Sequence, residues 1–192
     1  MENIFFDISR LKAIEKNSIV GKTVRIRKPA LVSIGRNSII DDFAYISCQL
    51  EMGDFSHIGA GCHMIGGPQA KVSIGNFVNI APSANIVAGQ NDYRTGGLVG
   101  PTIPEGHGGH ADVREVEIGN HVLLGCNVVV LPGVRLPEGV SVGAFSLLKS
   151  NVEYKQWTLY AGVPAREIGK RDGSLMKAQE EKLMKAVQEG LL

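Results

Sequence analysis

The sequence predicts an all-β fold, a parallel β-helix in which short strands wind into a triangular prism. One observation is a six-residue spacing of aliphatic side chains, a period that fits neither an α-helix nor an ordinary strand. A second is a small or branched residue four positions after each of them. A third is the glycine that often follows directly, where we expect the chain to bend. The longest unbroken run of the repeat is Ile34, Ile40, Ile46, Met52, Ile58 and Met64.

The repeat covers most of the chain. It begins faintly at Val20, passes a short bulge at residues 65–73 and continues to Ile86. It then resumes at Ile118 and runs to Leu148. Three hexapeptides make one coil, and stacking the coils places the aliphatic side chains inside the prism, each stabilised by roughly 1.5–3 kcal/mol on burial. Strands of an ordinary sandwich have no reason to keep this phase over so long a stretch.

Two segments depart from the repeat. Residues 92–117 form a long, glycine-rich excursion, and loops of that length are usually functional or disordered. From Ser174 to Gly190 an apolar stripe among lysines and glutamates predicts a helix that packs on the prism or on a neighbouring subunit. The sequence therefore predicts a β-helix domain over residues 1–171, with the excursion loop at 92–117, and a C-terminal helix within residues 172–192.

Composition narrows the class of protein. The 192 residues suffice for one sizeable core, and a net charge of +1 predicts no strong attraction to nucleic acid or membrane. No stretch resembles a signal peptide or a membrane span, which predicts a soluble, cytoplasmic protein. The odd count of three cysteines argues against a disulfide framework. We expect Cys62 in the core, and Cys48 and Cys126 outside it.

Three segments resemble the hexapeptide-repeat acyltransferases, whose fold is a left-handed parallel β-helix. VSIGNFVNIAPSANIVAG (72–89) and VEIGNHVLLGCNVVVLPGV (116–134) are similar to the coils before and after the excursion in galactoside and maltose acetyltransferases. YAGVPAREIGKR (160–171) resembles the exit loop of the family. The Asn-Asp-Tyr turn, the PTIP segment and the histidine of IGNHVLLG are most similar to the branch that acetylates sugars for surface polysaccharides.

The resemblance implies an acetyltransferase that moves an acetyl group from acetyl-coenzyme A to a sugar hydroxyl, in O-antigen or capsule synthesis. It also implies a homotrimer, with the active sites and the coenzyme A groove between neighbouring prisms and with the excursion helping to close them. No metal is expected, and the acceptor is a sugar or nucleotide sugar.

Acyl transfer needs a general base and a donor for the developing oxyanion. The catalytic histidine of galactoside-type relatives falls on Asn91, which offers only hydrogen bonds. We therefore expect His121 to be the base, pointing outward close to the corner that bears Asn91, with Asp92 orienting it. The alternative is that His121 is an exposed turn residue. The residues expected to contact the acceptor are His63, Tyr93, His107 and His110.

The resemblance also assigns coenzyme A contacts residue by residue. Leu123 takes the place of a bulky residue beside the pantetheine arm, Ala144 offers a backbone amide, and basic residues late in the chain approach the nucleotide end. The full set is Leu123, Cys126, Ala144, Lys149, Ala165, Arg166 and Lys170.

Three other interpretations stay open. The first is N-acetylation of a nucleotide-linked amino sugar, because an amine is a better nucleophile than a hydroxyl and tolerates a weaker base. The second is a zinc enzyme like the gamma-class carbonic anhydrases, although the histidine spacings are inconsistent with a convergent ligand set. The third is a non-catalytic scaffold, which requires neither the excursion nor the cationic exit segment.

Overall fold

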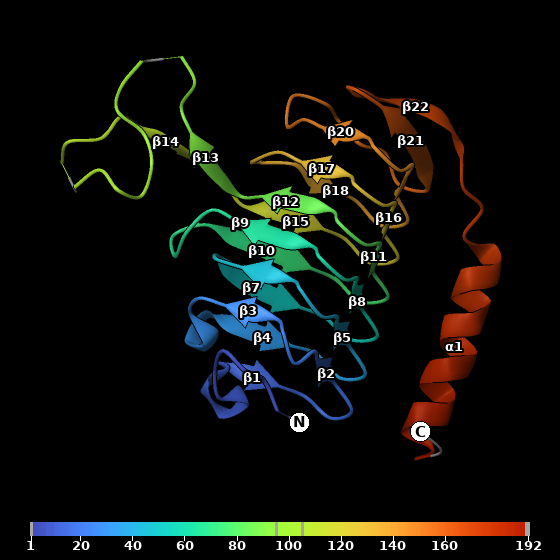
Figure 1. The fold of residues 1–192 in the computed structure, drawn as a ribbon. Helices are drawn as coiled ribbons and strands as arrows, with labels where there is room; N and C mark the ends of the chain where they lie inside the picture. Colours follow the sequence, from blue (N-terminus) through green and yellow to red (C-terminus); the bar gives the residue numbers. More distant parts are fainter. Residues whose placement is uncertain (1, 95, 105, 191–192) are drawn as a thin grey trace.

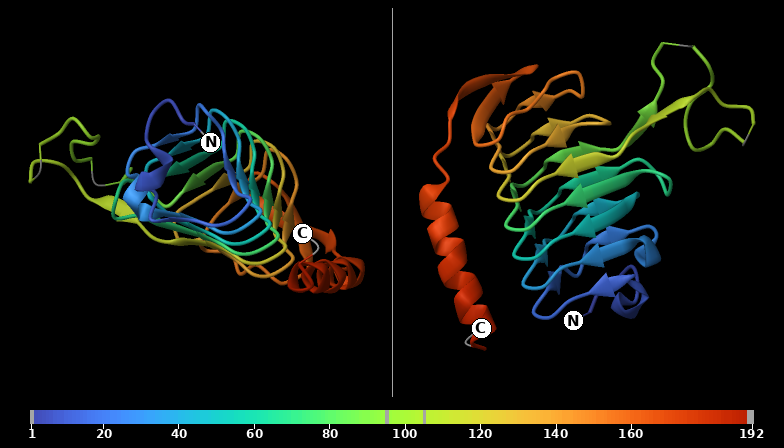
Figure 2. Two further views of the ribbon diagram at one scale, coloured as in Figure 1. Left: turned by 90° about the horizontal axis from the view of Figure 1, so that it is seen from below. Right: turned by 180° about the vertical axis from the view of Figure 1, so that it is seen from behind.

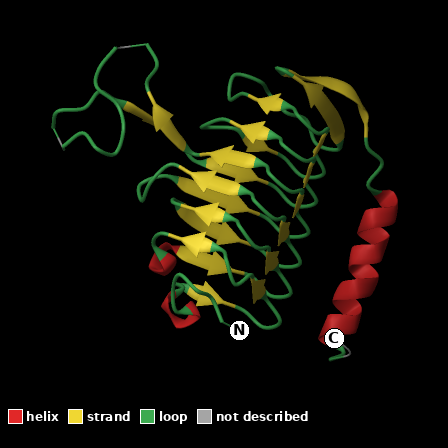
Figure 3. Cartoon of the chain, viewed as in Figure 1, coloured by secondary structure: helices red, strands yellow, loops and turns green. Residues whose placement is uncertain are grey.

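A computed structural model describes residues 2–94, 96–104 and 106–190, and in them the chain is a β-solenoid with one C-terminal helix (Figure 1 and Figure 3). Three sheets form the walls of a prism, which Figure 2 shows along its axis. The predicted left-handed β-helix with an excursion and a C-terminal helix is confirmed. Residues 95 and 105 of the excursion range and residues 1 and 191–192 at the ends lie outside the described part.

We call the three walls sheets A, B and C and give their strands in spatial order. Sheet A comprises β1 (Ala13–Ile14), β4 (Val32–Ile34), β7 (Gln49–Met52), β10 (Lys71–Ile74), β15 (Val116–Ile118) and β18 (Arg135–Leu136). Sheet B comprises β2 (Ile19–Val20), β5 (Ile39–Ile40), β8 (His57–Ile58), β11 (Asn79–Ile80), β16 (Leu123–Leu124), β19 (Ser141–Val142), β21 (Thr158–Gly162) and β22 (Ala165–Lys170). Sheet C comprises β3 (Arg25–Ile26), β6 (Tyr45–Ile46), β9 (His63–Ile65), β12 (Asn85–Val87), β17 (Val129–Val130) and β20 (Leu147–Leu148).

Successive coils pair in parallel and in register, so the aliphatic positions stack inside the prism. On sheet B, Ile40 pairs with Ile58 and Ile58 pairs with Ile80. All three side chains are fully buried. Each coil is therefore stabilised mainly by the apolar side chains of the coils above and below it.

The glycines that follow the strands allow neighbouring coils to pack closely, and they do not adopt the unusual φ for which we expected the bend to need glycine. A Cβ on Gly35 would lie 2.5 Å from the backbone of Gly53 in the next coil. The left-handed backbone positions come two residues later and carry larger side chains, with φ of 53° at Phe55, 58° at Phe77 and 59° at His121.

These left-handed residues form a column along the corner between sheets A and B. The Phe55 and Phe77 rings stack with centroids 5.1 Å apart. The helix α1 (Ser174–Gln188) lies beside this corner and runs back toward the N-terminal end of the prism (Figure 1). Two 3-10 turns, η1 (Ile8–Arg10) and η2 (Pro29–Leu31), complete the N-terminal end.

The cysteines differ from expectation at one position. Cys62 is buried and Cys126 is exposed, as predicted. Cys48 was expected outside the core but is buried, because it lies two residues after Ile46 at the corner between sheets C and A. Ala88 is buried at the equivalent place two coils further on. Within the described part of the chain, no helix is long and apolar enough to cross a membrane.

Candidate active site

The excursion leaves the corner between sheets C and A as an antiparallel hairpin of β13 (Gly89–Asn91) and β14 (Ala111–Val113) (Figure 1). Its register pairs Gln90 with Asp112 and Asn91 with Ala111. A two-stranded ladder is only marginally stable by itself. Contacts at its base therefore decide where its far end lies.

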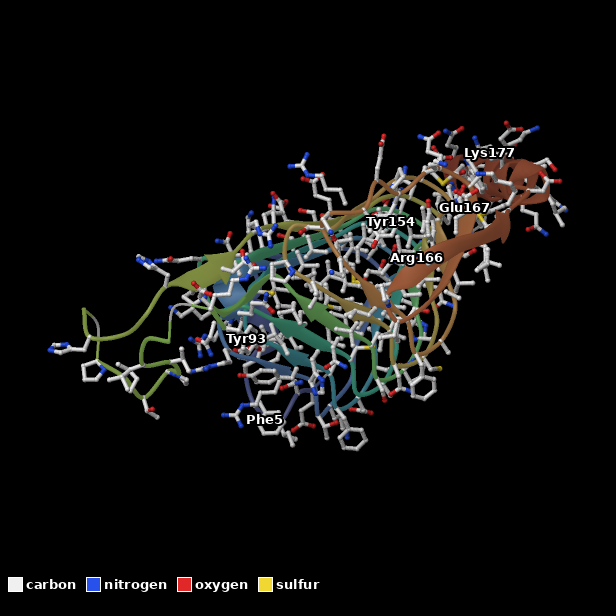
Figure 4. All side chains as sticks on the ribbon, turned by 90° about the horizontal axis from the view of Figure 1, so that it is seen from above. Phe5, Tyr93, Tyr154, Arg166, Glu167 and Lys177 are labelled. Atoms are coloured by element: carbon white, nitrogen blue, oxygen red, sulfur yellow. The ribbon has the colours of Figure 1, made fainter. Side chains whose placement is uncertain are left out.

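A cavity of about 590 Å³ opens where this hairpin meets the last coils, and we call it the hairpin cavity. Its volume lies in the usual range for small-molecule sites. Four predicted site residues, from the catalytic, acceptor and donor groups, come together in its wall: Asn91, Asp92, Tyr93 and Lys149. Figure 4 labels Tyr93 on this side of the prism.

Asp92 is held by the turn in which it lies. Its backbone N–H donates to the carbonyl of His110 at 3.0 Å, and its Oδ1 accepts from the backbone N–H of Arg94 at 2.8 Å. The side chain is half-buried and has no ion-pair partner among the described residues. A fixed carboxylate with a free oxygen can accept a proton from a bound nucleophile.

An arginine at the hairpin base holds a neighbouring carboxylate with two hydrogen bonds. Nε and Nη2 of Arg114 lie 2.6 and 2.7 Å from the two carboxylate oxygens of Asp112. These bonds hold the pKa of Asp112 below its usual value and raise the pKa of Arg114. Arg94 and Lys149, by contrast, line the cavity without an ion-pair partner in the described residues. The cavity thus offers two uncommitted cations and one uncommitted carboxylate.

The structure corrects the expected surroundings of His121. The residue lies at the corner between sheets A and B, whereas Asn91 extends from the corner between sheets C and A. Both corners border sheet A, but the excursion lies where its strands begin and His121 lies where its strands end. The expectation that His121 lies close to Asn91, with Asp92 orienting it, is therefore wrong within one chain. Six-residue spacing gives no information about which of the three corners the excursion leaves.

His121 is also covered, not exposed. Its ring lies between those of Phe77 and Trp157, with centroid distances of 5.3 and 6.0 Å, and the residue is only 4 % exposed. Its Nε2 lies 2.9 Å from Oε2 of Glu180 in α1, and its buried Nδ1 has no hydrogen-bond partner among the residues that the structure describes. As a base in this conformation, His121 would have to act from beneath α1.

The other predicted histidines are not among the described residues that line the hairpin cavity, although His110 lies beside it, because its carbonyl accepts the hydrogen bond from Asp92. On sheet C, Nδ1 of His63 lies 2.9 Å from Oδ1 of Asn85, and its ring meets the edge of Tyr45. His107 and His110 are exposed in the excursion, and neither lines the cavity.

The predicted coenzyme A contacts fall into two groups. One group lies on sheet B or at its corner with sheet C, and Figure 4 labels Arg166 there, away from Tyr93. The side chain of Ala165 is buried and offers no surface to a ligand. Lys149 alone lines the hairpin cavity. The exposed members of the first group are Leu123, Cys126, Ala144, Arg166 and Lys170.

A larger cavity of about 1020 Å³ lies along the outer face of sheet A, and no predicted site residue lines it. Two carboxylates of its wall are bridged by Lys71, whose Nζ lies 2.7 Å from Glu51 and 3.4 Å from Glu115. The hydroxyl of Ser73 donates to Glu115 and, with Lys71, holds the pKa of that carboxyl below its usual value. The two cavities share Ser150.

Sequence reasoning missed three residues at the hairpin base: Asp112, Arg114 and Ser150. The only signal for the first two is an acid and a base two positions apart, which places them on one side of an extended segment. Ser150 is distant in sequence and carried no signal. Within residues 2–94, 96–104 and 106–190, no group of three or more His, Cys, Asp or Glu side chains is placed to hold a metal ion.

Comparisons with known proteins agree with this architecture. No protein-family model matches the chain. A dTDP-4-amino-4,6-dideoxy-D-glucose acyltransferase of Escherichia coli is 32% identical over 184 residues, which cover 91% of this chain and 93% of that protein. Galactoside O-acetyltransferase of Escherichia coli K12 is 27% identical over 170 residues, covering 81% and 73%.

A solved structure is similar over nearly its whole length. AntD, an N-acyltransferase from Bacillus cereus in complex with dTDP and 3-hydroxybutyryl-CoA, has a TM-score of 0.84 and 31% identity, covering 95% of this chain and 98% of AntD. Taken with the stacked hexapeptide coils, these similarities identify the chain as a member of the hexapeptide-repeat acyltransferases, enzymes that draw the acyl group from an acyl-coenzyme A donor.

Proposed function

We propose that this enzyme transfers an acyl group from acyl-coenzyme A to the amino group of a nucleotide-linked amino sugar, with dTDP-4-amino-4,6-dideoxyglucose as the first candidate. The observation that carries this proposal is the share of each relative's length that this chain matches. The acyltransferase named for that sugar matches over 93% of its own chain, and AntD over 98%. The match to the galactoside O-acetyltransferase covers 73% of that enzyme at lower identity.

The hairpin cavity supports an amine as the nucleophile. Its lining contains the carboxylate of Asp92 and the amide of Asn91 but no histidine. A hydroxyl must lose its proton to become a strong nucleophile, whereas a neutral amine already attacks a thioester. Asp92 accepts the proton that the amine nitrogen loses as its bond to the carbonyl carbon forms. Collapse of the tetrahedral adduct breaks the C–S bond, and the proton passes to the departing coenzyme A thiolate.

The charge of the cavity supports a nucleotide-linked acceptor. A nucleoside diphosphate sugar carries two phosphates. Arg94 and Lys149 line the cavity and form no described ion pair, so both are free to hold an anion. Cations of this kind bind phosphate oxygens through charge-assisted hydrogen bonds.

We also propose a homotrimer. The residues assigned to the donor lie mainly on sheet B and its corner with sheet C, whereas Asp92 and the acceptor residue Tyr93 line the hairpin cavity at the corner between sheets C and A. In a ring of prisms, one corner of a copy faces a different corner of the next. A complete site would therefore combine two copies. Since nucleotide sugars are activated precursors of glycans, we place the reaction in the cytoplasm, in synthesis of a surface polysaccharide such as O-antigen or capsule.

The test offers dTDP-4-amino-4,6-dideoxyglucose and its 4-hydroxy analogue side by side with acetyl-coenzyme A. Release of the coenzyme A thiol is followed, and the products are examined by mass spectrometry. We expect an amide product from the amino sugar and negligible turnover of the hydroxy analogue. Equal or faster turnover of the hydroxy sugar would instead support O-acetylation. A second series with 3-hydroxybutyryl-coenzyme A tests the size of the acyl group.

A further inference from the structure

Arg114 joins three segments that are far apart in sequence. Its guanidinium holds both carboxylate oxygens of Asp112 in β14, and its Nη1 donates to Oγ of Ser150 on the last coil at 2.9 Å. Its backbone N–H donates to the carbonyl of Ala88, just before β13, at 3.0 Å. One residue therefore connects both strands of the excursion hairpin to the end of the prism.

The side chain of Arg114 occupies space that is available only because residue 133 is a glycine. Gly133 has a φ of +81°, which glycine adopts readily and other residues rarely do. A Cβ at this position would lie 2.9 Å from Nη1 of Arg114 and 3.3 Å from its Cδ. The side chain of Arg114 thus lies directly on the corner of the prism, and any larger residue at 133 would displace it.

The hydrogen bonds of Arg114 are committed to the protein. Although Arg114 lines the hairpin cavity, its Nε, Nη1 and Nη2 all donate to Asp112 or Ser150. A planar guanidinium that makes three such bonds fixes the direction of its partners more tightly than a lysine ammonium could. This commitment favours a role in holding the hairpin over a role in holding substrate.

The hairpin in turn carries Asp92. The hydrogen bond from Asp92 to the carbonyl of His110 continues the ladder just beyond the paired residues Asn91 and Ala111. Rotation of the hairpin at its base would therefore shift the carboxylate over the cavity. Misplacement of a reacting group by about 1 Å can lower a rate by about 10²-fold.

We propose that Arg114 is a positioning residue, which sets the angle of the excursion hairpin and thereby places the Asp92 carboxylate over the cavity. This inference rests on the proposed function in one respect, namely that Asp92 takes part in the reaction. Its structural half, that Arg114 fixes the hairpin, is independent of the substrate.

The experiment compares Arg114→Ala and Arg114→Lys with Arg36→Ala as the matched control. Arg36 forms an equally short ion pair with Asp54, at 2.7 Å, on a different corner of the prism. We expect Arg114→Ala to lower kcat roughly 10- to 100-fold, with KM for the acyl donor within about twofold. Arg114→Lys should recover little, and added guanidinium chloride at millimolar concentration should restore part of the kcat of Arg114→Ala only. Arg36→Ala should keep wild-type kinetics.

Hydrogen–deuterium exchange without substrate tests whether Arg114 fixes the hairpin, independently of whether the proposed reaction is correct. Amides of residues 89–92 and 110–113 should exchange faster in Arg114→Ala, and also in Gly133→Ala, which displaces the same guanidinium by steric contact. Unchanged exchange in both variants would overturn the inference, as would a rise in acceptor KM with kcat intact, which would make Arg114 a binding residue. If the wild-type enzyme fails to acylate the amino sugar while the exchange result holds, the proposed function fails and the positioning of the hairpin stands.

Discussion

Two corners of the same prism end in opposite kinds of environment. At the corner between sheets C and A, the excursion hairpin leaves the wall and frames a polar cavity that contains Asp92 and two uncommitted cations. At the corner between sheets A and B, a column of stacked rings is covered by α1, and His121 is enclosed between Phe77 and Trp157. Both corners are made by the same six-residue repeat.

The two corners differ in whether a proton-accepting atom remains accessible to a substrate. Asp92 is a partly exposed residue whose carboxylate keeps a free oxygen, whereas the Nε2 of His121 already lies against Glu180. A general base needs access to the proton that it removes, so the position of a candidate base is considered before its residue type. By this criterion we propose that the chemistry takes place at the first corner, whereas the second is covered by α1.

The strongest test of this comparison is Asp92→Asn. An asparagine keeps an oxygen for the hydrogen bond from Arg94, so the turn should persist, but it cannot accept a proton. We expect kcat to fall about 10²- to 10⁴-fold and the thermal midpoint to stay within a degree or two of the wild type. Steady-state kinetics and thermal unfolding measure the two quantities. Retention of turnover would remove Asp92 from the mechanism.

His121→Ala tests the other corner and should give the reverse result. The variant loses two ring contacts and leaves Glu180 without its partner, so we expect about 2–3 kcal/mol less stability. For a chain of this length that is a fall of about 5–10 °C in Tm. Turnover below the transition should stay within about threefold of the wild type.

Glu180→Gln is the control, because it keeps a side chain that can hydrogen-bond to the imidazole. It should lose less stability than His121→Ala. If His121→Ala instead kept its Tm and lost 10²-fold or more in kcat, the base would be the histidine, as the sequence alone led us to expect. The assignment of roles to the two corners would then have to be reversed.

The fold could be predicted from the sequence because the solenoid is stabilised by nearest neighbours. Each stacked residue, such as Ile58 between Ile40 and Ile80, obeys the same local rule, so the six-residue period gives the register of all three walls. The burial of Cys48 escaped prediction because corners differ from one another in how the chain turns. The period says nothing about those differences.

The site was predictable only where neighbours in sequence are neighbours in space. Asn91, Asp92 and Tyr93 lie together in the cavity because they are consecutive in the chain. His121 was assigned to the same place because it follows the excursion in sequence, yet the excursion leaves and returns at another corner. Ser150, which holds Arg114, lies 36 residues further along the chain, and no local pattern connects the two.

A smaller effect follows from pH at the first corner. The pKa of Asp112 is lowered by its hydrogen bonds to Arg114, so the ion pair stabilises the hairpin above the unfolded value, about 3.9, and this is lost as the pH falls through the lowered pKa. Since Asp112 is one-third exposed, we expect the ion pair to stabilise the hairpin by less than about 1 kcal/mol. The protection of the amides of residues 89–92, taken relative to the intrinsic exchange rate at each pH, should fall below about pH 4. In Asp112→Asn this protection should already be lower at neutral pH and should show no such fall. Identical pH profiles in the two proteins would contradict a role for the pair.

The third corner, between sheets B and C, allows the least disruptive test, because it carries the only exposed cysteine among the three. Burial raises the pKa of Cys48 to about 12 and that of Cys62 to about 11, so neither forms appreciable thiolate at neutral pH. A thiol reagent should therefore label Cys126 alone in the folded protein. Acetyl-coenzyme A should slow this labelling severalfold if the donor lies beside Cys126, and adenosine should not. If acetyl-coenzyme A does not change the labelling rate of Cys126, the donor binds away from this corner. The chemistry would then be restricted to the hairpin cavity and the sheet A face.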